Sequence, residues 1–249
     1  MAEKKFLLKV KRQDNPEGKT RWEEFEIDYR PNMNIIICLM EIRKNPVTRD
    51  GKRTTPVVWD SNCLEHVCGA CSMIINDQAR QACSTLVDRL DHPITLEPMT
   101  KFPLVRDLRV DRSKFFMDLK RAKAWIPIDG TYNLGPGPRL DSETQDIRYK
   151  LSTCMTCGVC MEVCPQYSPK TAFVGPAVIN QVRLMNLHPT GTMNKGERLE
   201  VMMGEGGVQD CGNAQNCVRA CPKQIPLTES IADVNRQTTW HGLLGWLKK

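Results

Sequence analysis

Cysteine is the residue whose placement most restricts what this chain can fold into. The sequence has 249 residues and 12 cysteines, and eleven of these fall in three runs, at 63–83, 154–164 and 211–221. In a reducing compartment, cysteines at such short intervals are typical of metal sites and not of disulfides. The fold therefore has to form around loops that present thiolates. The twelfth, Cys38, stands alone in the apolar stretch IIICLMEI, and we expect it to be a small buried hydrophobic residue.

The first run has the spacing Cys63-x4-Cys68-x2-Cys71-x11-Cys83. Three cysteines on one tight loop with a distant fourth are typical of a plant-type 2Fe–2S site. Gly69 lies inside that loop, where it allows the backbone to approach the sulfur atoms and to take an unusual φ. Structural zinc also binds four thiolates, but zinc sites more often use two C-x2-C pairs, so we favour 2Fe–2S. His66 is expected to be exposed or hydrogen-bonded, because four cysteines already fill the site.

The second run is Cys154-x2-Cys157-x2-Cys160-x3-Cys164-Pro165. It matches the run found in bacterial two-cluster ferredoxins, in which the fourth cysteine binds the other cluster. The third run, CGNAQNCVRACP at 211–222, then reads as the reciprocal half of a repeat. By this exchange Cys221 completes a 4Fe–4S site with Cys154, Cys157 and Cys160.

The same exchange leaves the other site one ligand short. Cys164 joins Cys211 and Cys217, and Ala214 stands where the pattern places a fourth cysteine. An alanine cannot bind iron, so the corner iron would be labile and a 3Fe–4S cluster is the expected occupant. The alternative is a 4Fe–4S cluster with an open iron for water or substrate. We favour it less, because no substrate-binding residues surround the run.

The first hundred residues predict a compact α+β domain. Apolar runs bounded by turn residues predict strands at 6–11, 25–29, 72–76 and 93–99, and a helix is expected from about 33 to 44. We expect this domain to span residues 1–110.

Residues 111–249 predict a second, all-α domain. Helical periodicity is visible at 115–125, with Phe116, Leu119 and Ala122 or Lys123 along one side, and again at 177–187. Ser142 and Gln145 suggest a capping box at the start of a helix. The Pro- and Gly-rich stretch at 126–140 is expected to be a loop crossing between halves.

Composition excludes several classes of protein. The 41% hydrophobic content suits a globular chain, and the longest apolar run, residues 34–40, falls far short of the roughly 18 residues that span a bilayer. The N-terminus lacks the apolar centre of a secretory signal, so we expect a cytoplasmic protein that meets a membrane only by docking. A net charge of +6 is moderate for this length, and nucleic acid is not an expected partner.

Taken together, the motifs resemble one family. WDSNCLEHVCGACSM, CMTCGVCMEVCP, FVGPA and CGNAQNCVRACPK occur in the order found in the iron–sulfur subunit of succinate dehydrogenase and fumarate reductase, the complex II family. The resemblance covers nearly the whole chain. It implies a plant-type ferredoxin (β-grasp) domain followed by an α-helical bacterial-type ferredoxin domain. It also implies a flavoprotein partner with covalent FAD and the dicarboxylate site, and a membrane anchor, often with haem b.

The resemblance also sets expectations for the reaction. The chain would carry electrons from flavin through 2Fe–2S, 4Fe–4S and 3Fe–4S clusters to a quinone, at the cytoplasmic side of a bacterial membrane, and would hold no catalytic acid or base. Ubiquinone-reducing members have a Trp five residues after the cysteine matching Cys164 and a His directly after the one matching Cys211. This sequence has Pro169 and Gly212 there, so menaquinone is the expected acceptor. The tail at 238–249 suits either an interface or a helix folded back onto its own domain.

Four other functions remain open at this stage. The same subunit serves fumarate reductases, which run in the opposite direction. A freestanding soluble multi-cluster carrier is a second alternative, although the chain is long for one. A zinc-binding interaction protein and a thiol-coupled fumarate reductase complete the set.

Overall fold

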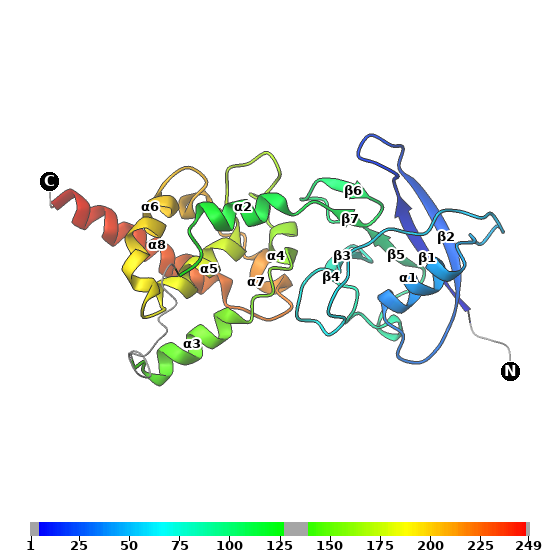
Figure 1. Cartoon of the computed structure of the whole chain (residues 1–249), viewed down its shortest axis with the longest axis horizontal. Helices are drawn as coiled ribbons and strands as arrows, with labels where there is room; N and C mark the ends of the chain where they lie inside the picture. Colours follow the sequence, from blue (N-terminus) through cyan, green and yellow to red (C-terminus); the bar gives the residue numbers. More distant parts are fainter. Residues whose placement is uncertain (1–4, 127–138, 248–249) are drawn as a thin grey trace. The chain divides into compact units, whose positions relative to one another are not determined.

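The computed structural model describes residues 5–126 and 139–247 (Figure 1). The chain divides into two compact units. Unit 1 comprises Met1–Arg112 together with Met155–Glu162, and unit 2 comprises Ser113–Cys154 and Val163–Lys249. Part of the second cysteine run therefore packs with unit 1, although it follows unit 2 residues in sequence.

Unit 1 is built on a five-stranded sheet. Its strands are β1 (Lys5–Arg12), β2 (Arg21–Asp28), β3 (Ser72–Ile75), β4 (Gln78–Gln81) and β5 (Ile94–Glu97). The spatial order is β2-β1-β5-β3-β4, with β1 and β5 parallel and the other neighbours antiparallel. A small second sheet pairs β6 (Leu104–Arg106) with β7 (Arg109–Val110). The four strands predicted from the sequence are all present.

Helix α1 (Ile35–Lys44) supplies the other half of this core. The Asn34 side chain accepts a hydrogen bond from the Ile37 amide and caps the helix start. Ile35 and Leu39 are fully buried against the sheet residues. Cys38 is also fully buried, as predicted, and its thiol donates to the Asn34 carbonyl at 3.4 Å. Burial raises the pKa of Cys38 to about 12.

A buried ion cluster fixes the segment that leads to the first cysteine loop. Arg12 on β1 is fully buried and donates through Nε to Asp107 Oδ1 at 2.9 Å, and its Nη1 pairs with Glu23. The other Asp107 oxygen accepts the Val58 amide at 3.0 Å. Because each buried charge has partners, the cluster holds the 55–58 segment in one place.

Unit 2 is helical. Its helices are α2 (Ser113–Arg121), α3 (Ser142–Ser152), α5 (Pro176–Asn186), α6 (Lys195–Met203), α7 (Asn216–Ala220) and α8 (Leu227–Leu247). Short 3-10 turns lie at η2 (Gly191–Asn194) and η3 (Val208–Asp210), whereas η1 (Val87–Arg89) belongs to unit 1. Helix α5 packs against α8; of the three apolar residues at helical spacing, Val178 and Val182 are fully buried as predicted, whereas Met185 is only partly buried.

Two local predictions were wrong. In α2 the buried residues are Phe115 and Asp118, whereas Phe116 is exposed, so the buried face begins one residue earlier than predicted. Helix α3 is capped by the Asp141 side chain, which accepts from the Thr144 amide at 2.7 Å. The cap thus lies one residue before the predicted capping box. Most of the predicted crossing loop, at 127–138, lies outside the described residues.

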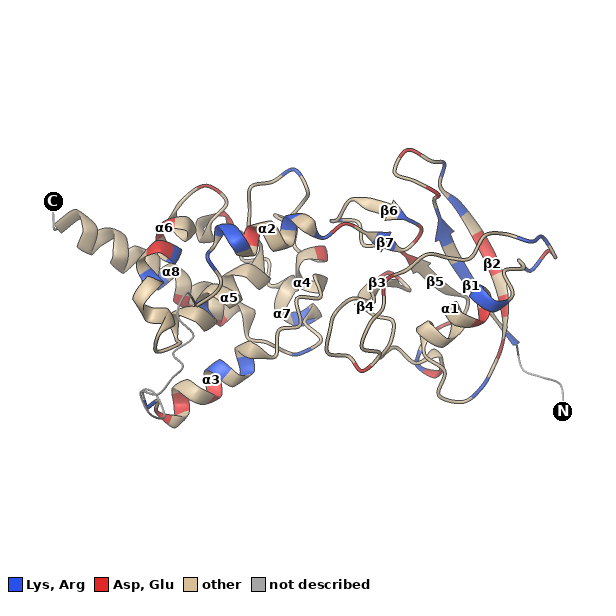
Figure 2. Ribbon diagram, viewed as in Figure 1, with Lys and Arg blue, Asp and Glu red and all other residues tan. Residues whose placement is uncertain are grey.

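The end of α8 carries exposed apolar side chains. Trp240 is 59% and Trp246 72% exposed, and Leu243, Leu244 and Leu247 are also exposed. Helix α8 bears little charge over this last stretch (Figure 2). Over the part of the chain that the structure describes, no helix has both the length and the apolar character needed to cross a membrane.

Candidate iron–sulfur sites

The first cysteine run forms a loop in unit 1 whose amides point at sulfur. Two backbone N–H groups, of Glu65 and Val67, donate to Cys63 Sγ at 3.4 and 3.5 Å. Hydrogen bonds to the charged form favour it, and these amides lower the pKa of Cys63 to about 7. Cys63 is thus prepared to act as a thiolate, which is the form that binds iron.

Two other cysteines of this run, Cys68 and Cys71, also accept backbone amides at sulfur. The Ala70 amide donates to Cys68 Sγ at 3.4 Å, and the Cys83 amide donates to Cys71 Sγ at 3.5 Å. Cys71 and Cys83 are buried next to β3 and β4, and burial raises the pKa of Cys71 to about 12. A buried thiol of this kind loses its proton when iron binds, because a metal centre stabilises the thiolate. This donor set fits a 2Fe–2S cluster.

The loop backbone is shaped to make these contacts. Leu64, His66 and Gly69 all have φ near +60°, at 61°, 58° and 68° respectively. Two of these residues carry a Cβ, so the loop holds a conformation that L residues rarely adopt. As expected, His66 is hydrogen-bonded: its Nε2 lies 3.1 Å from Gln81 Oε1. Leu64 and the neighbouring Val67 are exposed.

The four cysteines assigned to the second site are divided between the units. Cys157 and Cys160 are nearly buried in unit 1, around helix α4 (Val159–Glu162). Cys154 and Cys221 belong to unit 2, where the Ile225 amide donates to Cys221 Sγ at 3.5 Å. The four-ligand set therefore remains a prediction.

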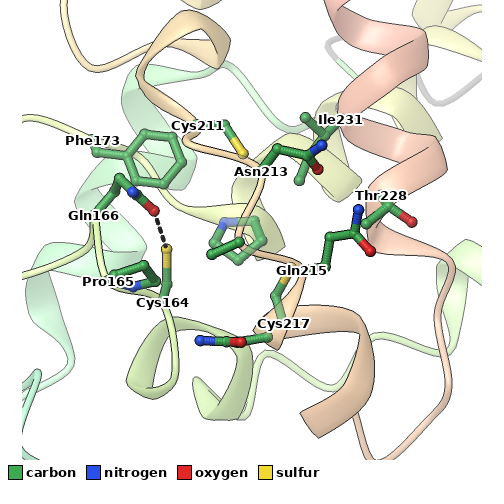
Figure 3. A pocket seen from close by; sticks show the side chains of 13 residues that line it. Cys164, Pro165, Gln166, Phe173, Cys211, Asn213, Gln215, Cys217, Thr228 and Ile231 are labelled. Atoms are coloured by element: carbon green, nitrogen blue, oxygen red, sulfur yellow. Dashed lines mark hydrogen bonds between the residues drawn. The ribbon is translucent and has the colours of Figure 1, made fainter.

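The third set of cysteines lines one cavity within unit 2. Cys164, from the second run, and Cys211 and Cys217, both from the third run, surround the space shown in Figure 3, with Ala214 also in its wall. The space measures about 340 Å³, counting the part open to solvent. Burial raises the pKa of Cys217 to about 11, and the neighbouring Cys164 and Cys211 thiols raise it further. The structure thus brings Cys164 close to Cys211 and Cys217, and the binding of one cluster by these three remains a prediction.

The wall of this cavity contains a residue that the sequence analysis missed. Gln166 Oε1 accepts from Cys164 Sγ at 3.8 Å (Figure 3). A Cβ at Gly212 would lie 2.4 Å from Gln166 Nε2, so the glycine leaves room for this side chain. Phe173 and Ile231 add apolar surface. No sequence motif marks Gln166, because its role depends on a residue 46 positions further along the chain.

Among residues 5–126 and 139–247, no group of three or more His, Cys, Asp or Glu side chains is placed to hold one metal ion. All twelve cysteines are free thiols.

Comparison with known proteins decides the family. The domain described as "2Fe-2S iron-sulfur cluster binding domain" matches residues 7–117, and "4Fe-4S dicluster domain" matches residues 150–225. The chain is 60% identical to the succinate dehydrogenase iron–sulfur subunit of Bacillus subtilis, over 96% of this chain and 94% of that protein. The chain belongs to the succinate dehydrogenase iron–sulfur subunit family.

More distant relatives agree with this assignment. The fumarate reductase iron–sulfur subunit of Wolinella succinogenes is 31% identical over 88% of this chain and 90% of that protein. A chain of the Mycobacterium smegmatis Sdh1 complex in the apo form superposes with a TM-score of 0.77, at 23% identity, over 95% of this chain and 96% of that chain. That likeness shows the fold: a 2Fe–2S ferredoxin domain with a sheet, followed by a helical domain. The α+β fold class predicted from the sequence is confirmed.

Proposed function

We propose that this subunit carries electrons from an FAD-containing flavoprotein to a quinone, by binding a 2Fe–2S, a 4Fe–4S and a 3Fe–4S cluster. When bound, the clusters supply one-electron carriers between a two-electron flavin and a two-electron quinone. The observation that carries the proposal is the cavity in which Cys164 meets Cys211 and Cys217 beside Ala214, because it separates a three-thiolate site from the four-thiolate loop of unit 1.

The ligand sets follow the cysteine runs. Unit 1 would hold the 2Fe–2S cluster through the first run. The 4Fe–4S cluster would be held by Cys154, Cys157, Cys160 and Cys221. The 3Fe–4S cluster would be held by Cys164, Cys211 and Cys217. The loop amides donate to the sulfur atoms of the first set, and Phe173 and Ile231 form part of the wall around the third.

Partners and location follow from the family. A flavoprotein would carry FAD and the dicarboxylate chemistry, so no residue here serves as a catalytic acid or base. A membrane anchor with haem b would hold the complex at the cytoplasmic side of a bacterial membrane, with this subunit peripheral. The exposed apolar end of α8, with Trp240 and Trp246, favours contact with that anchor or with lipid over folding back.

Menaquinone is the proposed acceptor. Gly212 and Pro169 replace the His and Trp of ubiquinone-reducing relatives, and the space beside Gly212 is taken by Gln166. The test is to reconstitute the purified complex with either quinone. Succinate should reduce menaquinone in a cluster-dependent reaction. Finding ubiquinone as the natural acceptor in native membranes would overturn this assignment.

The principal alternatives are fumarate reduction by the same chain and a soluble electron carrier. Greater identity to the succinate dehydrogenase subunit, 60% against 31%, favours succinate oxidation. Affinity purification of the tagged chain from membranes distinguishes the carrier. The proposed subunit brings a flavoprotein with it, whereas a carrier comes alone. Zinc in place of iron and acid-labile sulfide would exclude both.

A further inference from the structure

Two cysteine loops meet within unit 1. Gly69, between Cys68 and Cys71 of the first run, lies against the segment Met155–Glu162 of the second run. A Cβ at Gly69 would lie 2.6 Å from Cys157 Cα and 2.7 Å from the Met155 carbonyl oxygen. Real Cβ atoms do not approach backbone so closely, so only glycine permits this contact.

Arg112 joins the same two loops by hydrogen bonding. Its Nη1 donates to the Gly69 carbonyl at 2.9 Å and makes a longer contact, 3.5 Å, with the Cys157 carbonyl. The Gly69 carbonyl also accepts from Ser72 Oγ at 3.0 Å, which fixes it to the start of β3. One half-buried guanidinium thus bridges backbone groups about ninety residues apart in the sequence.

The Glu162 end of the segment 155–162 makes its own contacts, which do not involve Arg112. Glu162 is nearly buried, and its carboxylate accepts from the Thr100 and Lys101 amides, each at 2.9 Å. At Gly158 the loop packs against Phe102, whose ring carbon would lie 3.0 Å from an added Cβ. The segment is therefore fixed at both ends, and Arg112 acts at the end that carries Cys157.

We propose that Arg112 and Gly69 are positioning residues that hold the Cys157 backbone against the first cysteine loop and so set the electron-transfer distance between the two cysteine sets. The proposal rests on the ligand sets given under the proposed function. Electron tunnelling between two centres weakens steeply with distance, so a contact that excludes even one methyl group between the loops affects the rate.

The test compares matched variants in the intact, purified complex. Gly69→Ala adds a methyl group at the contact, and Gly51→Ala is its control, because Gly51 also has positive φ but nothing lies within 4 Å of an added Cβ. Arg112→Gln removes the bridge, and Arg43→Gln removes the same charge from an exposed position at the end of α1. The controls therefore account for backbone strain and for net charge.

The readout is the spin relaxation of the reduced 2Fe–2S centre, measured by electron paramagnetic resonance with the second centre oxidised and then reduced. In the unmodified complex the reduced second centre should enhance this relaxation. Gly69→Ala and Arg112→Gln should lose a large part of that enhancement and should show faster hydrogen exchange across 155–162. Both control variants should behave as the unmodified complex does.

Three results would overturn the proposal: unchanged enhancement in variants that retain both centres, equal loss in the controls, or failure of Arg112→Gln to assemble either centre, which would make Arg112 a folding residue. If the unmodified complex itself contains no second centre, the proposed function fails instead, and the two failures are thereby distinguished.

Discussion

The first cysteine loop and the three-cysteine cavity bring cysteine thiols together in different ways. The loop takes all four thiolates from unit 1, and backbone amides donate to the sulfurs of Cys63, Cys68 and Cys71. The cavity takes three thiols from two distant segments of unit 2, one ending at Cys164 and the other holding Cys211 and Cys217, and places Ala214 in its wall. The loop is thus determined mainly by local backbone geometry, whereas the cavity is determined by how distant segments pack.

This difference has chemical consequences. A complete thiolate set holds every iron, so the loop favours a fixed composition. A set with one ligand missing leaves one iron position open, so the cavity favours a different cluster type and a different potential. Adding or removing a cysteine ligand at the loop or at the cavity should therefore change the iron content of the cluster at that site alone.

The largest effect is expected when the loop loses a ligand. Cys68→Ser should abolish the 2Fe–2S centre and with it succinate-driven quinone reduction, because one of its two irons loses a thiolate ligand. Iron and acid-labile sulfide analysis together with electron paramagnetic resonance measures this. Retention of the 2Fe–2S signal in this variant would show that the ligand set is wrong.

The converse change should complete the cavity. Ala214→Cys supplies the missing thiolate, so the third centre should gain one iron and lose the 3Fe–4S signal of the oxidised state. Its reduction potential should fall, and quinone reduction should slow. The measurement is iron content per complex with a redox titration. An unchanged 3Fe–4S signal would mean that Ala214 does not face the cluster.

The first cysteine loop should be lost before the three-cysteine cavity when the buried ion cluster of unit 1 is weakened. Asp107→Asn weakens the buried cluster with Arg12, and breaking such a pair costs about 3 kcal/mol. Thermal unfolding of the complex should begin at lower temperature, with the 2Fe–2S signal lost before the 3Fe–4S signal. Asp14→Asn, at an exposed ion pair with Arg21, is the control and should leave both signals in place. Simultaneous loss of the two signals would contradict the independence of the regions.

The smallest effect concerns the cysteine outside both regions. Cys38→Ala should retain all three centres and cost about 2 kcal/mol of stability for the lost packing.

The folded-state pKa of Cys38 is raised to about 12, so the folded state keeps a proton that the unfolded chain releases above about pH 9. Unfolding of the unmodified protein is therefore favoured as pH rises from about 9 to 12, and the variant should lose less stability over that range. Chemical denaturation at pH 8 and pH 10 measures the free energy of unfolding of the unmodified protein and of the variant. If the stability advantage of the unmodified protein over the variant were larger at pH 10 than at pH 8, the burial of this thiol would be contradicted.

Sequence alone was sufficient for features carried by local spacing. The 2Fe–2S spacing, the strands and the isolation of Cys38 are short-range patterns, and the structure shows the strands and the buried thiol where they were expected. The nearness of Cys164 to Cys211 and Cys217 in one cavity was also predictable, because a repeat carries long-range information in its order; that they bind one cluster remains a prediction.

Features that depend on the approach of distant segments were not predictable. Phe115 and Phe116 are adjacent, and only packing decides which is buried. Asp141 and Ser142 are both good capping residues, so the helix start was misplaced by one position. Gly69 was explained from the sequence by its nearness to sulfur, whereas the structure adds the contact with Cys157.

The most direct test is a reductive titration of the purified complex, followed by electron paramagnetic resonance together with iron, sulfide and zinc analysis of the same sample. The distribution of eleven cysteines into sets of four, four and three predicts one 2Fe–2S, one 4Fe–4S and one 3Fe–4S centre, with the 3Fe–4S signal visible before any reductant is added. Zinc in place of iron, or only two centres in fully loaded material, would contradict it.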